Sequence, residues 1–211
     1  MQITERITIF AQIKTNCAQI REKRTIQLMA IGRTMQRIEN KKLLFEYLVY
    51  LLEQWKEEMH PHSKEAFTKL KLQKILFLVA SVNAVEDNHP LLDVFDNFYA
   101  LPYGPVEIDI YEAMCNNDFK TIKFEGNYCK HSLNDDNFTA LDEKRKKAMS
   151  EAVQAIKGKG ADYINTDAFE LVEITHKWTS WQIAMQMAEM FGSKRESMST
   201  EDIINSTVKA Y

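Results

Sequence analysis

Turn-forming residues are scarce in this chain of 211 residues, which contains six Gly and four Pro. All-β proteins use many of both at their turns, so this scarcity favours a mainly helical fold. Cysteine is scarce as well, because Cys17, Cys115 and Cys129 are odd in number and form no C-x-x-C spacing. The pattern is typical of incidental thiols in a reducing cytoplasm, and it argues against a disulfide framework or a zinc site.

Long apolar runs and familiar chemical motifs are missing too. Residues 75–79 form an apolar run that is far too short to cross a bilayer, and the N-terminus lacks the pattern of a secretory signal. We therefore expect a cytoplasmic protein that is not associated with a membrane. The chain has no glycine-rich phosphate loop, dinucleotide fingerprint, nucleophile elbow or H-E-x-x-H zinc motif, so we expect no cofactor.

Charge is distributed unevenly along the chain. Residues 1–42 contain nine Lys and Arg and three Glu, a net charge of +6, whereas residues 43–211 carry −9. We predict that residues 1–42 are a basic N-terminal helical extension and that residues 43–211 form the folded domain. The extension either binds nucleic acid or folds against the acidic body, and nucleic acid is the weaker alternative because no helix-turn-helix pattern is present.

The extension itself carries a helical pattern. Apolar residues recur at helical spacing, with cationic residues between them, at Ile3, Ile7, Phe10 and Ile13. The sequence leaves open whether the segment is a helical arm or partly disordered. Met29 and Met35 are alternative starts of translation, so we also leave open whether the first 28 or 34 residues are made in the cell.

Apolar periodicity and capping residues predict the helices of the folded domain. A helix over residues 43–58 has one apolar face, and a helix over residues 69–86, capped by Thr68, is apolar almost all round and therefore central. Further helices are predicted from a Thr139-x-x-Asp142 cap to about residue 157, over residues 167–176 and over residues 181–190, the last capped by Ser180. A final helix is predicted after a cap at Ser199 or Thr200. Residues 95–101 predict a short strand and residues 120–132 a β-hairpin. The predicted fold class is therefore mainly α, of the α+β type: a compact helical domain with a small β element.

The segment Tyr103-Gly104-Pro105 predicts the start of another helix, which runs to about Met114. Gly104 suits the N-cap and Pro105 the first helical position, where its missing N–H costs nothing. The same periodicity places Glu107 on the exposed side of that helix. We also expect Gly104→Val to damage folding, because a tight turn with a positive φ disfavours a β-branched residue.

Histidines are the remaining candidates for chemistry. His60 and His62 flank a proline in a turn without a Cys or carboxylate pair at ligand spacing, so we expect no metal site. His176 closes a helix, and Trp178 and Trp181 follow it. His176 either acts as an acid or base with a nearby carboxylate, or it bonds the backbone of a turn above the two indoles. We favour the structural role, and expect no catalytic residues, because no second catalytic group can be named.

Three separated pieces of the sequence together resemble a known family. They are residues 71–79 (KLQKILFLV), residues 98–106 (FYALPYGPV) followed by Tyr111, and residues 171–181 (LVEITHKWTSW). In this order and spacing they are similar to the Panacea domain of the SocA-like antitoxins, a family that includes phage-associated bacterial proteins, and the likeness covers about residues 43–190. The residues that carry it are Lys71, Leu72, Lys74, Leu76, Tyr99, Tyr103, Gly104, Pro105, Val106, Tyr111, Thr175, His176, Trp178 and Trp181.

The resemblance implies an antitoxin that neutralises a co-encoded toxin by direct protein contact. Some relatives are similar to adaptors that deliver the bound toxin to a protease, so a protease is a second implied partner. The resemblance implies no catalytic, cofactor-binding or metal-binding residues, and it does not extend to residues 1–42. The alternatives are an enzyme or nucleic-acid-processing protein that uses His176 with a nearby carboxylate, and a DNA-binding protein that uses residues 1–42.

Overall fold

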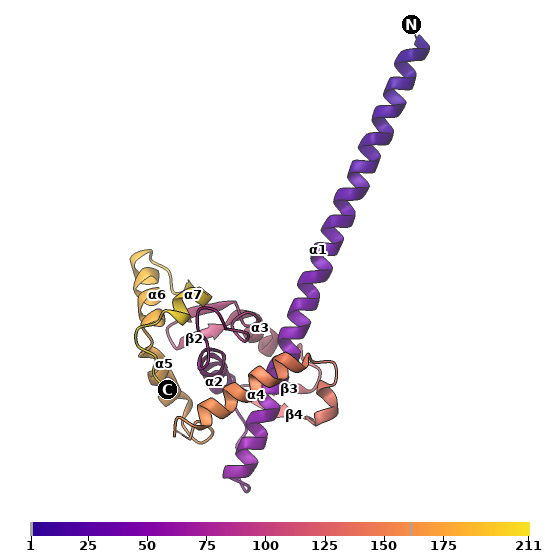
Figure 1. Ribbon diagram of the computed structural model, residues 1–211. Helices are drawn as coiled ribbons and strands as arrows, with labels where there is room; N and C mark the ends of the chain where they lie inside the picture. Colours follow the sequence, from indigo (N-terminus) through magenta and orange to yellow (C-terminus); the bar gives the residue numbers. More distant parts are fainter. Residues whose placement is uncertain (1, 161) are drawn as a thin grey trace. The chain divides into compact units, whose positions relative to one another are not determined.

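The chain divides into two units, Met1–Glu39 and Asn40–Tyr211. The computed structural model describes the backbone of residues 2–160 and 162–211, and the side chains of residues 27–160 and 162–211. The first unit contains the beginning of helix α1 (Gln2–Met59), and every other element belongs to the second unit (Figure 1). Four apolar side chains of the predicted helical pattern lie outside the described side chains: Ile3, Ile7, Phe10 and Ile13.

The second unit is mainly helical with short antiparallel strands, so the predicted fold class is confirmed. Its helices after α1 are α2 (Lys69–Ser81), α3 (Ile108–Asn116), α4 (Glu143–Lys157), α5 (Ala168–His176), α6 (Thr179–Met190) and α7 (Thr200–Ile204), with a 3-10 turn over Asp135–Phe138. Its strands are β1 (Phe98–Leu101), β2 (Gly104–Glu107), β3 (Ile122–Glu125), β4 (Tyr128–His131) and β5 (Glu196–Met198). No helix in the described part of the chain is long and apolar enough to cross a membrane.

Helix α2 forms the centre of this unit because its circumference is apolar nearly all round. Residues 72–81 are all buried, and the helix contacts α3, α4, α5 and β2, which surround it in Figure 1. Thr68 accepts a hydrogen bond from the backbone N–H of Lys71 at 3.2 Å, as expected of the predicted cap. The helix ends earlier than predicted, because Val85 and Asn88 pair through their backbones in a tight turn.

Three strands form an antiparallel sheet in the order β2-β1-β5. Strands β1 and β2 are joined so closely that Leu101 pairs with Gly104. The prediction that Gly104 and Pro105 begin a helix is therefore wrong, since both belong to β2, and α3 begins at Ile108 with Glu107 as its N-cap. Pro105 is tolerated because β2 lies at the edge of the sheet.

The predicted β-hairpin is confirmed as β3 and β4, which turn at Gly126 with a φ of +61°. The segment before α2 lies against it, because the N–H of Cys129 donates to the Phe67 carbonyl at 2.8 Å. The prediction that Ser180 caps α6 is wrong. Trp178 holds the cap position, and the N–H of Ser180 instead donates to Oγ of Ser206 at 2.8 Å.

Candidate functional site

Four residues that carry the family resemblance meet at the turn between β1 and β2. Gly104 has a φ of +87°, a backbone conformation that glycine adopts far more readily than other residues. A Cβ atom at this position would lie 2.6 Å from Oγ1 of Thr175 and 3.0 Å from Nζ of Lys74. The Lys74 ammonium donates to the Pro105 carbonyl at 2.6 Å. These side chains therefore fix the turn against α2 and α5.

Lys74 is fully buried at this turn. Burial lowers the pKa of Lys74 to about 7, because no ionic partner among the described residues offsets the loss of water. The Pro105 carbonyl accepts a hydrogen bond from the amine in either protonation state. Lys74 therefore serves the turn as a buried hydrogen-bond donor and not as a surface charge.

His176 lies in the corner between α5 and α6. Its ring stacks on the Trp181 indole, with centroids 3.9 Å apart and an angle of 12° between the planes. Nε1 of Trp181 donates to the Leu101 carbonyl at 3.0 Å, and Nε1 of the buried Trp178 donates to the Ala210 carbonyl at 2.8 Å. The two indoles thus join this corner to β1 and to the C-terminal segment.

The surroundings of His176 favour a structural role. Burial lowers the pKa of His176, and Lys74 lowers it further, whereas Glu173 and the Pro102 carbonyl raise it. Nδ1 of His176 lies 3.9 Å from Oε1 of Glu173, beyond hydrogen-bond distance. In this arrangement the two side chains do not form the hydrogen-bonded pair that acid–base catalysis uses.

An open groove of about 630 Å³ lies beside the β1–β2 turn. The beginnings of α2 and α5, the turn itself, α3 and the tip of the hairpin all contribute to its walls. Its aliphatic lining includes Leu70, Leu101 and Val106. Four aromatic side chains border it, and each is between 43% and 63% exposed: Tyr103, Tyr111, Tyr128 and Phe169. We call this feature the aromatic groove.

The aromatic groove has the composition of a protein-binding surface. Exposed aromatic side chains bordering an apolar hollow are typical of interaction sites, and tyrosine is enriched among the residues that dominate binding energies. Tyr103 and Phe169 already contact each other edge to face, with ring centroids 6.5 Å apart. Part of the border is therefore ordered before any partner arrives.

The sequence predicted only part of this groove. Tyr103, Val106 and Tyr111 belong to the residues that carry the resemblance, whereas Tyr128 and Phe169 were missed. Tyr128 follows the hairpin turn and Phe169 lies in the first turn of α5, where each is a large apolar residue at an exposed position. A single exposed aromatic residue is ordinary, so the sequence held no signal that could have identified them.

The remaining residues of the resemblance lie away from the groove. Leu72 and Leu76 are fully buried in α2. Lys71 is half-buried, and its Nζ donates to the Ile164 carbonyl at 2.5 Å. Tyr99 is half-buried on β1. These residues stabilise the fold that positions the groove.

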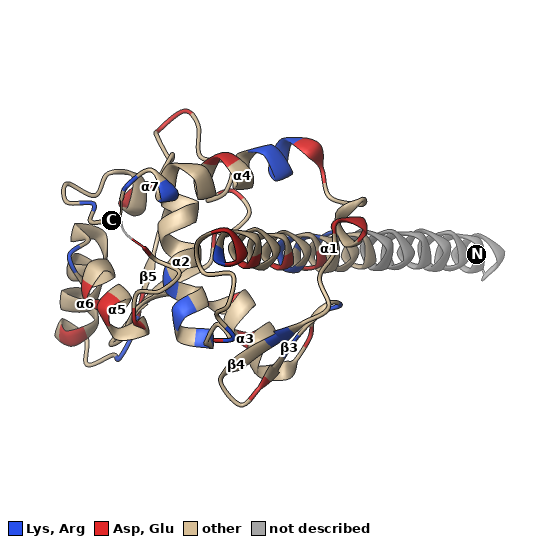
Figure 2. Cartoon of the chain, turned by 90° about the horizontal axis from the view of Figure 1, so that it is seen from below, with Lys and Arg blue, Asp and Glu red and all other residues tan. Residues whose placement is uncertain are grey.

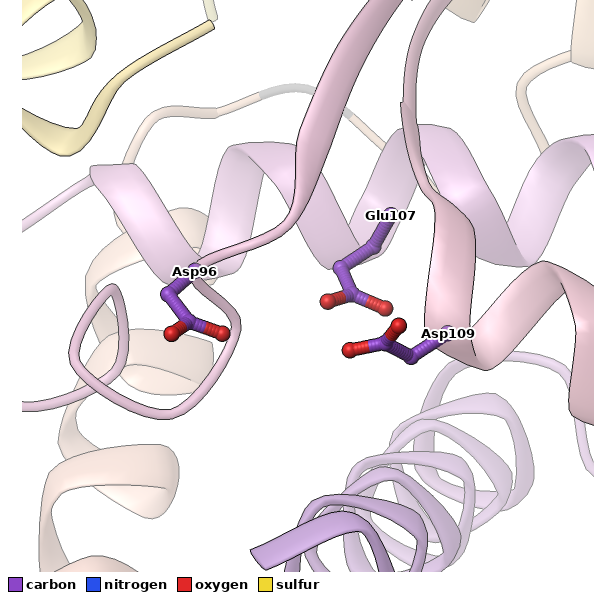
Figure 3. Close-up of side chains that lie close together, drawn as sticks. All are labelled: Asp96, Glu107 and Asp109. Carbon is purple, nitrogen blue, oxygen red and sulfur yellow. The ribbon is translucent and has the colours of Figure 1, made fainter. Parts of the chain in front are cut away.

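An ion-pair cluster around the buried Lys41 and Glu107 lies in another part of the second unit. Asp96, Glu107 and Asp109 direct their carboxylates toward one another (Figure 3), close enough to suit a cation. Nζ of Lys41 lies 2.9 Å from Asp96, 2.6 Å from Glu107 and 2.5 Å from Asp109. The ammonium of Lys41 thus takes the place that a metal ion would need. Its neighbour Lys42 lies 2.9 Å from Asp118, so both lysines, which belong to the second unit, pair with acidic residues of that unit.

Glu107 was predicted to be exposed and is fully buried, which is a correction to the sequence analysis. Burial raises the pKa of Glu107 to about 7, although Lys41 and the N–H of Ile110 lower it. Burial by itself lowers the pKa of Lys41, but the three carboxylates raise it above its ordinary value. The backbone N–H of Glu107 also donates to Oε1 of Gln73 at 2.9 Å. Glu107 is therefore bonded in the interior to Lys41 on α1 and to Gln73 on α2.

One family model, described as "Antitoxin SocA-like, Panacea domain", matches residues 72–182 of the chain. Comparisons with curated proteins and with solved structures gave no match. The matched residues contain most of α2, the β1–β2 turn, the hairpin and the four aromatic side chains of the groove. Because the match covers more than half of the chain, this protein belongs to the SocA-like antitoxin family and carries its Panacea domain.

Proposed function

We propose that this protein is a cytoplasmic antitoxin that neutralises a co-encoded protein toxin by direct binding, with residues 43–211 as the binding domain. Membership of the antitoxin-like family supports the antitoxin-type role. The observation that carries direct binding is the aromatic groove, where four exposed aromatic side chains surround an open apolar hollow. A fully buried aromatic side chain covers roughly 150–250 Å², and about half of that area is still exposed on each of these four, so together they can supply a substantial share of one partner's interface.

The groove is held ready for binding by the turn beneath it. Tyr103 lies in the two-residue turn between β1 and β2, and the hydrogen bond from Lys74 to the Pro105 carbonyl fixes the strand that follows. The contact between Tyr103 and Phe169 orders a second part of the border. A preformed site loses less conformational entropy on binding, which favours the tight complex that stoichiometric neutralisation requires. In this mechanism the antitoxin covers the active or membrane-acting surface of the toxin without changing it chemically.

Delivery of the toxin to a protease is the alternative mechanism that the family resemblance implies. An adaptor shortens the half-life of the toxin, whereas an antitoxin that acts by covering the toxin leaves the half-life unchanged or lengthens it. We propose the covering mechanism, because the groove supports one protein contact and adaptor action needs a second. A pulse-chase measurement of toxin half-life with and without this protein distinguishes the two.

The direct test is growth rescue with the product of the neighbouring open reading frame. Expression of that product alone should stop growth, and co-expression of this protein should restore it. Phe169→Ser should abolish rescue because Phe169 borders the groove. Phe191→Ser is the matched control, since Phe191 is 76% exposed at the end of α6 and does not line the groove. A toxic neighbour that this protein fails to neutralise would contradict the proposal.

A further inference from the structure

Tyr128, which borders the aromatic groove, shares the outward face of the β3–β4 hairpin with two lysines. We propose that the combined surface binds an acidic segment of the partner protein that carries a large apolar anchor residue. This inference rests on the proposed function, because it names the chemistry of the partner at the same groove. Three observations support it: the register of the hairpin, the charges on its outward face and the shape of the groove.

The register of the hairpin places two lysines beside the groove. Lys123 lies directly opposite Lys130, and Glu125 lies opposite Tyr128. Burial alternates along β3, with Lys123 and Glu125 on its exposed side, and both Tyr128 and Lys130 are exposed on β4. Because side chains two residues apart share a face of a strand, Lys130 lies roughly 7 Å along the strand from Tyr128, which borders the groove.

The two lysines have no ionic partner among the described residues, although like charges placed directly opposite each other destabilise a hairpin. Figure 2 shows basic residues on this hairpin and at the beginning of α2, in a domain whose residues 43–211 carry a net charge of −9. Lys69 lines the groove at the beginning of α2, and its Nζ lies 5.4 Å from the ring centroid of Phe124, on the buried face of β3.

Two acidic residues also belong to this region. Glu125 shares the outward face of the hairpin, and Asp167 lines the groove on the side of α5. Oδ1 of Asp167 already accepts a hydrogen bond from the N–H of Phe169 at 2.7 Å, where it caps the helix. Lysines therefore outnumber free carboxylates on the hairpin side, and the complementary partner is acidic at that side.

The size and lining of the groove indicate which other residue the acidic segment of the partner carries. Its volume of about 630 Å³ is several times the roughly 150 Å³ of an apolar cavity that holds one benzene. Space of that size, lined by aliphatic and aromatic side chains, suits a large apolar anchor residue of a peptide segment. Nucleic acid fits less well, because Tyr103 and Phe169 meet at 74° and so offer no parallel platform for stacked bases.

The experiment is a selection of random short peptides displayed on phage against the full-length protein. We expect the selected peptides to combine Asp or Glu with Trp, Phe or Leu. A fluorescein-labelled copy of the most enriched peptide should bind the Lys123→Glu, Lys130→Glu double variant about tenfold more weakly than the parent protein. The matched control reverses Lys144 and Lys194 to Glu, because both are exposed and neither lines the groove. It should change the affinity less than about twofold.

Several results would overturn the inference. Selection of basic peptides, failure to select any peptide, or equal binding by the double variant would each do so. Displacement of the selected peptide by single-stranded oligothymidylate would identify the surface as a nucleic-acid site instead. Thermal melting of both double variants checks that each remains folded.

The growth assay separates this inference from the proposed function. If the parent protein rescues growth and the Lys123→Glu, Lys130→Glu variant rescues equally well, the proposal of an acidic partner segment is wrong and the antitoxin function stands. If the parent protein itself gives no rescue, the proposed function fails. A loss of rescue in this double variant alone, with the Lys144 and Lys194 control intact, is the result that we expect.

Discussion

Replacement of Gly104 by alanine tests the turn beneath the groove with a single methyl group. The new Cβ would lie 2.6 Å from Oγ1 of Thr175, closer than two such atoms approach in folded proteins. Thr175 is buried, and its Oγ1 donates to the Val172 carbonyl at 2.9 Å. The threonine side chain must therefore move and lose that hydrogen bond, or the turn must shift away from α5.

The expected loss of stability has two parts. A positive φ costs a residue other than glycine roughly 1–2 kcal/mol. A buried polar group that loses its hydrogen-bond partner costs about 1–3 kcal/mol more. We therefore expect Gly104→Ala to lower the free energy of unfolding by about 2–5 kcal/mol.

Urea denaturation followed by far-ultraviolet circular dichroism measures this loss. Gly126→Ala is the matched control, because Gly126 has a φ of +61° and an added Cβ would meet no atom within 4 Å. The control should lose only the roughly 1–2 kcal/mol of backbone strain. A second change, Thr175→Ala, removes the clashing atom, so the double variant should be more stable than the sum of the single losses predicts. Equal losses in Gly104→Ala and Gly126→Ala would refute the reasoning.

Three further predictions concern the core and the buried charges. Leu76→Ala should cost about 2–5 kcal/mol in urea denaturation because Leu76 is fully buried in the central helix, and a loss under about 1 kcal/mol would contradict that position. Lys41→Met should cost about 3–5 kcal/mol by leaving Glu107 buried without its cation, and Glu107→Gln in the same chain should restore part of the loss. Between pH 7 and 10 the parent protein should gain up to about 1.4 kcal/mol of stability per pH unit relative to Lys74→Met. The gain arises because folded Lys74, with a pKa of about 7, has lost the proton that unfolded lysine keeps up to about pH 10.5, and parallel pH profiles would contradict it.

Elements with strong local signals could be predicted from the sequence. Helix α2 carries a capping threonine and apolar residues over nearly its whole circumference, and the hairpin turns at a glycine between alternating residues. These signals lie within one segment, so no knowledge of the rest of the fold is needed. The family resemblance likewise depends on short local pieces.

The turn at Gly104 could not be predicted correctly, because its local signal favours a different structure. Glycine followed by proline is a common helix start, and only the pairing of β2 with β1 shows that the chain continues as a strand. Glu107 is a similar case. A carboxylate near a helix start is usually exposed, and here Lys41, which is 66 positions earlier, draws it into the interior.

The groove shows the same limit at a larger scale. Tyr103, Tyr128 and Phe169 lie on separate elements, and only the packing of the hairpin and α5 against α2 brings them to one opening. Each residue alone is an ordinary exposed aromatic. Their common border is a property of the tertiary structure, which periodicity cannot supply.

The most direct test of the central claim is a calorimetric titration of this purified protein with the purified product of the neighbouring open reading frame. We predict a one-to-one complex, and we predict that Phe169→Ser weakens it by about 2 kcal/mol, or roughly thirtyfold in the dissociation constant, while Phe191→Ser leaves it unchanged. Absence of binding by the parent protein would contradict the antitoxin function. Equal binding by Phe169→Ser and the parent protein would show that the aromatic groove is not the binding surface.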